Sequence, residues 1–125
     1  MSFLAGTDVA VAFMYPGFSL HDELALLVRD LGFSPMDALR AATHNPTLFF
    51  RNEKALGAIQ PGLAADLVLL DADPLADIQN TKRIYGVMLR GLWLKRPSLD
   101  RMLKSVEHSA QTGCKAESAV LNQTA

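Results

Sequence analysis

Apolar positions recur at helical spacing in the first third of the chain. Between residues 20 and 31 they lie three or four positions apart, which places them on one face of a helix: Leu20, Leu24, Leu27, Val28 and Leu31. Ser19 is a suitable N-cap for this segment, and Gly32 is suited to end it. The pattern therefore predicts an amphipathic helix between these two residues.

A second helix is predicted directly afterwards. Ser34 and Pro35 are a cap and a first helical residue, and apolar side chains then continue at helical spacing to about His44. Asn45 precedes Pro46, and a residue before proline disfavours helical geometry. His44 is therefore expected at a helix C-terminus, where the helix dipole favours a cation.

From residue 57 the pattern changes to short strands bounded by turn residues. Residues 66–71 form an apolar run between two carboxylates, which predicts a strand buried on both faces. Residues 73–80 form a loop, residues 83–90 a second strand, and residues 89–93 the turn of a hairpin. This half of the chain is predicted to form a small sheet.

The two ends of the chain differ in pattern. Residues 2–5 are apolar and are followed by Gly6, Thr7 and Asp8, as in a buried strand that ends in a polar loop. A last helix is predicted from Pro97 to Glu107. Residues 108–125 are small and polar without a sustained period, which predicts a disordered tail. The element order is α+β in character, and its first strand requires neighbouring strands.

Composition limits the class of protein. Half of the 125 residues are apolar, and 12 Lys plus Arg against 13 Asp plus Glu leave a net charge of -1. No block of like charge suits a nucleic acid or an anionic membrane, and no apolar run is long enough to span a bilayer. Cys114 is the only cysteine, so an intrachain disulfide is excluded. Without a secretory signal pattern, we expect a soluble, cytoplasmic protein.

Four blocks of sequence occur in a characteristic order: GTD at residues 6–8, PGFSLHDEL at 16–24, GFSPMDALRAATHNP at 32–46, and LGAIQPGLAADLVLLD at 56–71. Together they resemble the C-terminal part of the metal-dependent amidohydrolases, in the imidazolonepropionase and Xaa-Pro dipeptidase-like branch. The resemblance extends over residues 4 to 96. Any one block is weakly specific, whereas four in this order are strongly specific.

The resemblance implies a fold for each part of the chain. It implies an α+β fragment that contains the last strand and helices of a (β/α)8 barrel and the C-terminal part of a small β-sandwich. The expected divisions are a barrel βα segment at 1–55, a sandwich segment at 56–97, a helix at 98–107 and the tail at 108–125. Asp8 would then stand at the C-terminal end of a barrel strand, where active sites of such barrels lie.

The resemblance also implies a role for Asp8. In the family the corresponding aspartate lies beside one or two divalent metals, such as zinc, takes a proton as hydroxide attacks a carbonyl, and passes it to the leaving nitrogen. The family's His-x-His and its other ligands have no match here, since His21, His44 and His108 are far apart. We therefore expect Asp8 to be a catalytic group, and a metal ligand only together with ligands from elsewhere, with no metal bound by this chain alone.

Three residues near Asp8 are candidates for substrate binding. Tyr15 and Phe18 belong to the loop after Asp8 and either line a pocket or pack on the next helix. His21 either approaches the substrate or is a surface or capping histidine. The expected substrate is a small amide, a dipeptide or a cyclic C–N compound. The alternative is a non-catalytic, truncated domain that self-associates or binds a complementing barrel segment.

Overall fold

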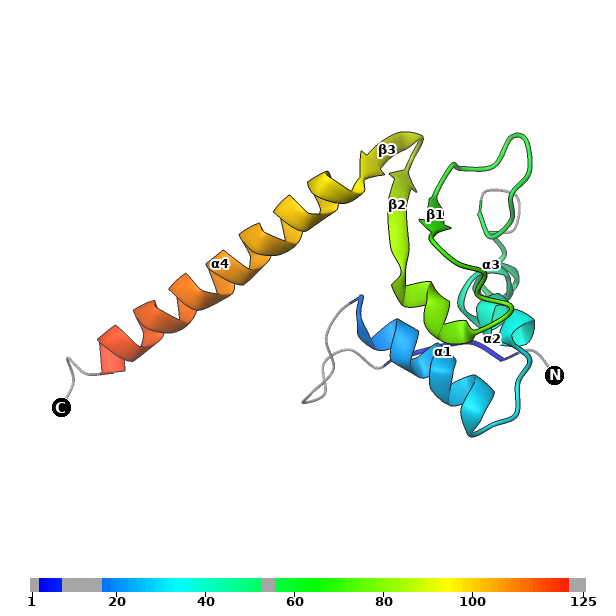
Figure 1. The fold of residues 1–125 in the computed structure, drawn as a ribbon, viewed down its shortest axis with the longest axis horizontal. Helices are drawn as coiled ribbons and strands as arrows, with labels where there is room; N and C mark the ends of the chain where they lie inside the picture. Colours follow the sequence, from blue (N-terminus) through cyan, green and yellow to red (C-terminus); the bar gives the residue numbers. More distant parts are fainter. Residues whose placement is uncertain (1–2, 8–16, 53–55, 122–125) are drawn as a thin grey trace. The chain divides into compact units, whose positions relative to one another are not determined.

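The computed structural model describes residues 3–7, 17–52 and 56–121 (Figure 1). Contacts divide the chain into two compact units, with the boundary after Trp93. The elements follow one another in this order: α1 (Ser19–Arg29), α2 (Pro35–Ala42), α3 (His44–Phe49), β1 (Leu67–Leu70), the 3-10 helix η1 (Ile78–Lys82), β2 (Ile84–Leu89), β3 (Leu92–Lys95) and α4 (Arg96–Leu121).

Helix α1 confirms the first amphipathic pattern but begins differently from the prediction. Phe18 occupies the N-cap position without a side-chain cap hydrogen bond, and Ser19 is already helical. The C-terminal end of α1 agrees with the predicted stop at Gly32. Gly32 has a φ of 69°, and the Phe33 N–H donates to the Leu27 carbonyl at 3.1 Å. A positive φ is readily adopted by glycine, so Gly32 lets the chain leave the helix sharply.

Helix α2 starts as the sequence predicts. The Ser34 hydroxyl accepts a hydrogen bond from the Asp37 N–H at 3.1 Å and donates to Asp37 Oδ2 at 2.6 Å. The expected end at His44 is wrong, because the chain turns at Thr43 and His44 begins α3. Pro46 lies in the first turn of α3, where its missing N–H leaves no intrahelical hydrogen bond unmade.

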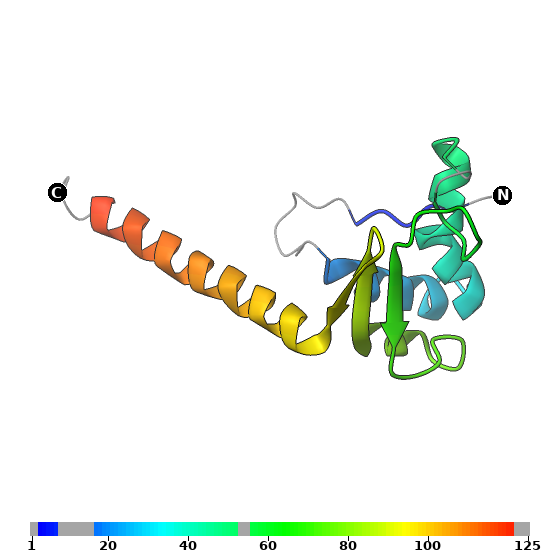
Figure 2. The same ribbon diagram turned by 90° about the horizontal axis from the view of Figure 1, so that it is seen from above.

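The three strands form one sheet in the order β1-β2-β3. Strands β1 and β2 are antiparallel and lie side by side in Figure 2, with Val68 opposite Val87. The predicted hairpin turn is confirmed, and Arg90 and Gly91 take φ values of 49° and 82°. Two successive positive φ values suit a two-residue turn whose twist matches that of the strands.

Strand β1 is less buried than its apolar sequence predicts. Val68 and Leu69 are 56% and 51% exposed. Successive side chains of a strand point to opposite faces, so both faces of β1 are partly open. Burial on both faces requires a layer of structure on each side, and the described residues of this chain do not cover either face of β1 completely.

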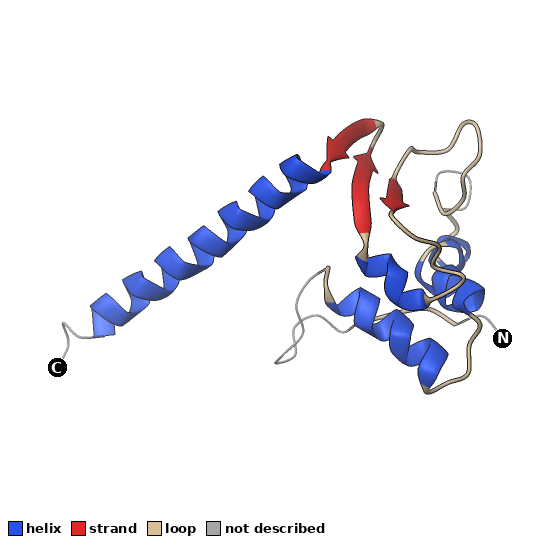
Figure 3. Cartoon of the chain, viewed as in Figure 1, coloured by secondary structure: helices blue, strands red, loops and turns tan. Residues whose placement is uncertain are grey.

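The N-terminal segment is not a strand among the described residues 3–7, contrary to the prediction, and Figure 3 draws it as a loop. It is nevertheless attached to the helices. The Ala5 N–H donates to the Ala41 carbonyl at 2.9 Å, and Asn45 Nδ2 donates to the Phe3 carbonyl at 2.9 Å. A strand requires a hydrogen-bonded neighbour, and these helical groups do not provide a ladder.

The core of the first unit joins α1, α2 and η1. Leu24, Ala38 and Ile78 are 4%, 0% and 6% exposed and form one cluster. Partly buried apolar side chains pack around them: Ala25, Leu27, Val28, Phe33, Leu39 and Ala42. Two alanines at 0% exposure, Ala38 and Ala41, allow close approach of neighbouring backbone along α2.

Helix α4 is longer than the sequence predicts. A helix ending near Glu107 and a disordered tail were expected, whereas α4 continues to Leu121. Residues 108–121 contain one glycine but no proline, and their alanine, lysine, glutamine and glutamate residues favour helix without requiring an apolar stripe. None of the helices in the described part of the chain combines the length and apolar content needed to cross a membrane.

Candidate functional site

The sequence-predicted site residues fall into two groups. Asp8 and Tyr15 lie outside the described residues, whereas Phe18 and His21 lie at the start of α1. Phe18 is the N-cap residue of α1 and is 61% exposed. His21 is partly buried in the first turn of the helix. The described part of the candidate site is therefore the N-terminal end of α1 and the main chain that precedes Asp8.

A carboxylate of α1 binds that main chain directly. The Gly6 N–H donates to Glu23 Oε1 at 2.7 Å. The other carboxylate oxygen, Glu23 Oε2, is buried and has no hydrogen-bond partner among the described residues. Gly6 precedes Asp8 by two residues. The contact thus ties α1 to the segment that carries the predicted catalytic carboxylate.

His21 is located in the same turn of α1. Its Nδ1 atom is buried without a hydrogen-bond partner in the described ranges. Desolvation by burial, followed by the positive charge of Lys82, lowers the pKa of His21 below its ordinary value, and the charge of Asp22 opposes this change. These effects favour the neutral form of the imidazole, in which one ring nitrogen can accept a proton or a hydrogen bond.

Asp22 and Lys82 connect the start of α1 to η1. Lys82 Nζ lies 2.6 Å from Asp22 Oδ1, and both side chains are substantially exposed. The hydrogen bond from Lys82, together with its charge, lowers the pKa of Asp22. Exposed ion pairs contribute little to stability. This pair therefore places Asp22 and Lys82 side by side but adds little to the free energy of unfolding.

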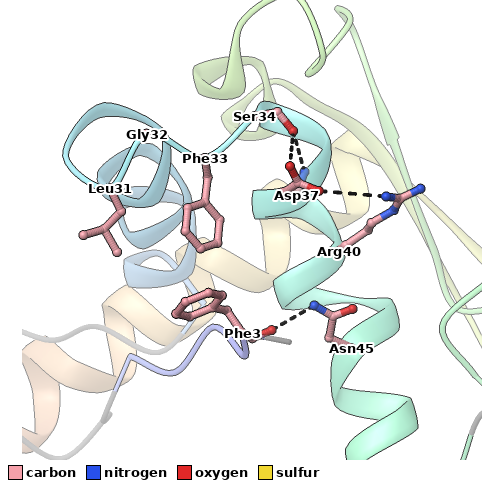
Figure 4. Close-up of a pocket in the computed structure, with 8 residues that line it drawn as sticks. All are labelled: Phe3, Leu31, Gly32, Phe33, Ser34, Asp37, Arg40 and Asn45. Carbon is pink, nitrogen blue, oxygen red and sulfur yellow. Dashed lines mark hydrogen bonds and ion pairs between the residues drawn. The ribbon is translucent and has the colours of Figure 1, made fainter. Parts of the chain in front are cut away.

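A pocket of about 530 Å³ lies at the other end of the N-terminal segment (Figure 4). It is lined by residues of that segment, of the α1–α2 connection and of α2 and α3: Phe3, Leu31, Gly32, Phe33, Ser34, Asp37, Arg40 and Asn45. The rings of Phe3 and Phe33 meet edge to face with centroids 5.0 Å apart. Phe3 is bound at the start of α3, whereas Gly6 is bound at α1, so this pocket is separate from the Gly6–Glu23 contact.

The described residues do not by themselves form a metal site. Among residues 3–7, 17–52 and 56–121, no group of three or more His, Cys, Asp or Glu side chains could hold a metal ion. A catalytic zinc normally has about three protein ligands and a water. The donor set of the described residues does not fit such an ion.

His21 was named from the sequence as a candidate for substrate binding, which stays a prediction, and Glu23 was not named. Glu23 was recognisable only as an acidic residue near a helix N-terminus, where a carboxylate is common. Its partner Gly6 is 17 positions away, and a main-chain N–H leaves no trace in the sequence. No sequence signal could have paired them.

His21 gives the chain a testable pH dependence. The unfolded chain takes up a proton near the ordinary pKa of 6.5, whereas folded His21 does so only at lower pH. In that interval the unfolded state binds more protons, so stability falls as the pH drops below about 6.5. We expect the melting temperature to fall less between about pH 7.5 and pH 5.5 in His21→Gln than in the wild type. An equal fall in both proteins would contradict a buried neutral His21, and His44→Gln is the matched control.

The sequence matches the model of the amidohydrolase family over residues 1–94. The chain is 34% identical to ochratoxinase of Aspergillus niger over 98 residues, which cover 75% of this chain and 19% of that protein. It is 36% identical over 96 residues to imidazolonepropionase of Streptomyces coelicolor, covering 70% of this chain and 24% of that protein. The chain belongs to the amidohydrolase family.

Solved structures agree with this assignment. A Xaa-Pro dipeptidase with methionine in its active site superposes on 60% of this chain and 18% of its own, with a TM-score of 0.56 and 29% sequence identity. The chain thus spans about a fifth of the length of the relatives it matches. The predicted branch of the family, with imidazolonepropionase and Xaa-Pro dipeptidase as members, is confirmed.

Proposed function

We propose that this chain supplies the C-terminal segment of an amidohydrolase site that hydrolyses amide or cyclic C–N bonds. The observation that carries the proposal is the family match over residues 1–94, which includes the Gly6-Thr7-Asp8 block. Relatives named ochratoxinase, imidazolonepropionase and Xaa-Pro dipeptidase support a substrate of this class. Residues 1–55 would belong to a (β/α)8 barrel, and β1 to β3 would belong to its small β-sandwich.

Asp8 has the central chemical role in this proposal. Hydrolysis of an amide requires a base that takes a proton from the attacking water and an acid that protonates the leaving nitrogen. One carboxylate can do both in sequence, since it is ionised before the attack and protonated after it. Tyr15, Phe18 and His21 would face the substrate from the loop after Asp8 and the start of α1. The metal ligands typical of the family would come from outside residues 1–125.

The exposed apolar surface of the chain favours a second candidate, self-association without catalysis. Phe49 and Phe50 are 68% and 73% exposed and stack edge to face with centroids 5.1 Å apart. Ile59 is 87% exposed. Clustered exposed aromatics are typical of surfaces that bind protein. A covering barrel segment or a second copy of this chain would each bury these side chains.

A chimera tests the first proposal. Residues 1–94 replace the matching part of the Xaa-Pro dipeptidase, and hydrolysis of an Xaa-Pro dipeptide is measured together with metal content. We expect the chimera to be active and Asp8→Asn to lower kcat by at least about 100-fold, the usual effect of removing an acid–base group. The isolated chain should show neither stoichiometric metal nor turnover.

Three results would contradict this assignment. A folded chimera that is inactive with the wild-type segment, or one in which Asp8→Asn retains full activity, would exclude the proposed role of Asp8. Stoichiometric zinc and turnover in the isolated chain would show that its site is complete. Sedimentation separates the second candidate, because a monomeric isolated chain would exclude self-association.

A further inference from the structure

Helix α4 lies beyond the residues that match the amidohydrolase family, because the match ends at residue 94 and α4 begins at Arg96. Its first half carries an apolar stripe with a spacing of three or four residues, which places the stripe on one face of the helix. The stripe consists of four side chains, of which the last three are 52%, 45% and 68% exposed: Leu99, Met102, Leu103 and Val106. We propose that this α4 stripe binds the α4 stripe of a second copy of the chain, with the two helices antiparallel.

The charged residues of this part of α4 lie away from the stripe. At 3.6 residues per turn they fall within an arc of about 140°, and the stripe lies outside that arc: Arg96, Asp100, Arg101, Lys104 and Glu107. A two-fold symmetric pair brings each face against itself, so a charge within the stripe would meet a like charge. The stripe contains none. A second copy is therefore a suitable partner, whereas a charged surface would find no counter-charge there.

One border of the stripe consists of three serines, Ser98, Ser105 and Ser109. The Ser109 hydroxyl donates to the Ser105 carbonyl at 2.9 Å, and the Ser98 hydroxyl accepts from Arg101 Nη2 at 3.2 Å. Hydroxyls that are bonded within their own helix lose less when a second helix excludes water from them. The small side chains of this border also allow a short distance between the two helix axes.

The other border of the stripe determines the direction of the pairing. It carries Arg96 near one end and Glu107 near the other. In an antiparallel pair the equivalent borders of the two helices lie side by side. With Met102 opposite the second copy's Leu103, Arg96 lies within about 3 Å of the level of the second copy's Glu107, because each residue rises about 1.5 Å. Arg96 Nε holds Asp100 at 2.9 Å, and the five N–H donors of a guanidinium suffice for a second carboxylate. In a parallel pair this border would face uncharged serines.

Sedimentation equilibrium of the full 125-residue chain tests the inference. A small interface of this kind associates weakly, so the concentration series extends to about 1 mM. We expect a monomer–dimer equilibrium that Met102→Glu weakens at least about 30-fold, because each dimer then carries two charges in its apolar seam. Gln111→Glu is the matched control, since it adds the same charge within the charged arc and should leave the dimer unchanged. Methionine, glutamine and glutamate are similarly good helix formers, so both variants retain α4.

Disulfide formation determines the direction of the pairing. Chains with Leu99→Cys are mixed with chains with Val106→Cys, both in a Cys114→Ser background, and oxidised. The antiparallel pair brings Leu99 opposite Val106 of the other copy. We therefore expect the mixed disulfide to form in excess over both homodimers. Leu99→Cys homodimers in excess would indicate a parallel pair and overturn the proposed arrangement.

Three further results would overturn the inference. The first is a monomer throughout the concentration series, and the second is an association that Met102→Glu weakens no more than Gln111→Glu does. The third is an association that persists in Met102→Glu and is lost in Phe49→Ser, which would place the contact at the Phe49–Phe50 pair. These measurements need no activity, so they fail independently of the chimera experiment.

Discussion

Gly57→Ala is expected to destabilise the chain by about 2–5 kcal/mol, the sum of an unfavourable positive φ and an overpacked contact. Gly57 has a φ of 90°, and a Cβ placed on it would lie 2.6 Å from Thr47 Cγ2 and 2.7 Å from Thr47 Oγ1. Thr47 is 8% exposed, and its hydroxyl donates to the His44 carbonyl at 2.7 Å. The threonine therefore cannot move aside without losing a part-buried hydrogen bond. Chemical denaturation followed by far-UV circular dichroism measures the effect.

A matched control separates the two causes. Gly62 has the same φ of 90° but has no atom within 4 Å of its Cβ position. Gly62→Ala should therefore show only the conformational part, about 1–2 kcal/mol. In a Thr47→Ala background, Gly57→Ala should cost nearly as little as Gly62→Ala. The steric explanation fails if Gly57→Ala and Gly62→Ala destabilise the wild-type chain equally.

The Gly57–Thr47 contact illustrates what sequence reasoning could not reach. Helix α2 was predictable because Ser34 and Pro35 signal a helix start within a few residues, and the hairpin turn at Arg90 and Gly91 was similarly local. Thr47 and Gly57 carry no signal for one another. Glycine indicates that the backbone is unusual at a position but does not show which side chain approaches it.

Two of the wrong predictions share a physical cause. The strand expected at residues 2–5 and the double-sided burial expected for β1 both require neighbouring structure, and an apolar run in a sequence does not reveal whether that structure is supplied by the same chain. The early end predicted for α4 has the opposite origin. Residues 108–121 lack an apolar period, but intrinsic helix propensity needs no partner.

The candidate site was predictable only in part. Asp8 was proposed from the resemblance and His21 from its place after the Asp8 loop, and both roles stay predictions. Two contacts at the start of α1, the Gly6–Glu23 hydrogen bond and the Asp22–Lys82 pair, join positions 17 and 60 residues apart. The first pairing depends on the path of residues 3–7 beside α1 and the second on the packing of α1 against η1, and only the folded chain shows either.

Ile78→Ala is expected to destabilise the first unit by about 2–4 kcal/mol, because it empties part of a core with few fully buried side chains. Ile78 is 6% exposed and packs with Leu24 and Ala38. Leu24→Ala should have a similar effect, and the two should be non-additive since the side chains belong to one cluster. Leu26→Ala is the control for Leu24→Ala, because both residues lie on α1. Leu26 is 45% exposed, so its substitution should destabilise the chain much less.

The same variants test whether the segments on either side of residue 55 fold together. Leu24 and Ala38 precede this point, and Ile78 follows it, yet they form one core. We therefore expect Trp93 fluorescence, which reports on the end of the sheet, and far-UV circular dichroism, which reports mainly on the helices, to show coincident transitions. Both should shift together in Ile78→Ala. Separate transitions would mean that the helical segment and the sheet are independent folding units. The contacts of Ile78 with Leu24 and Ala38 would then not make their unfolding cooperative.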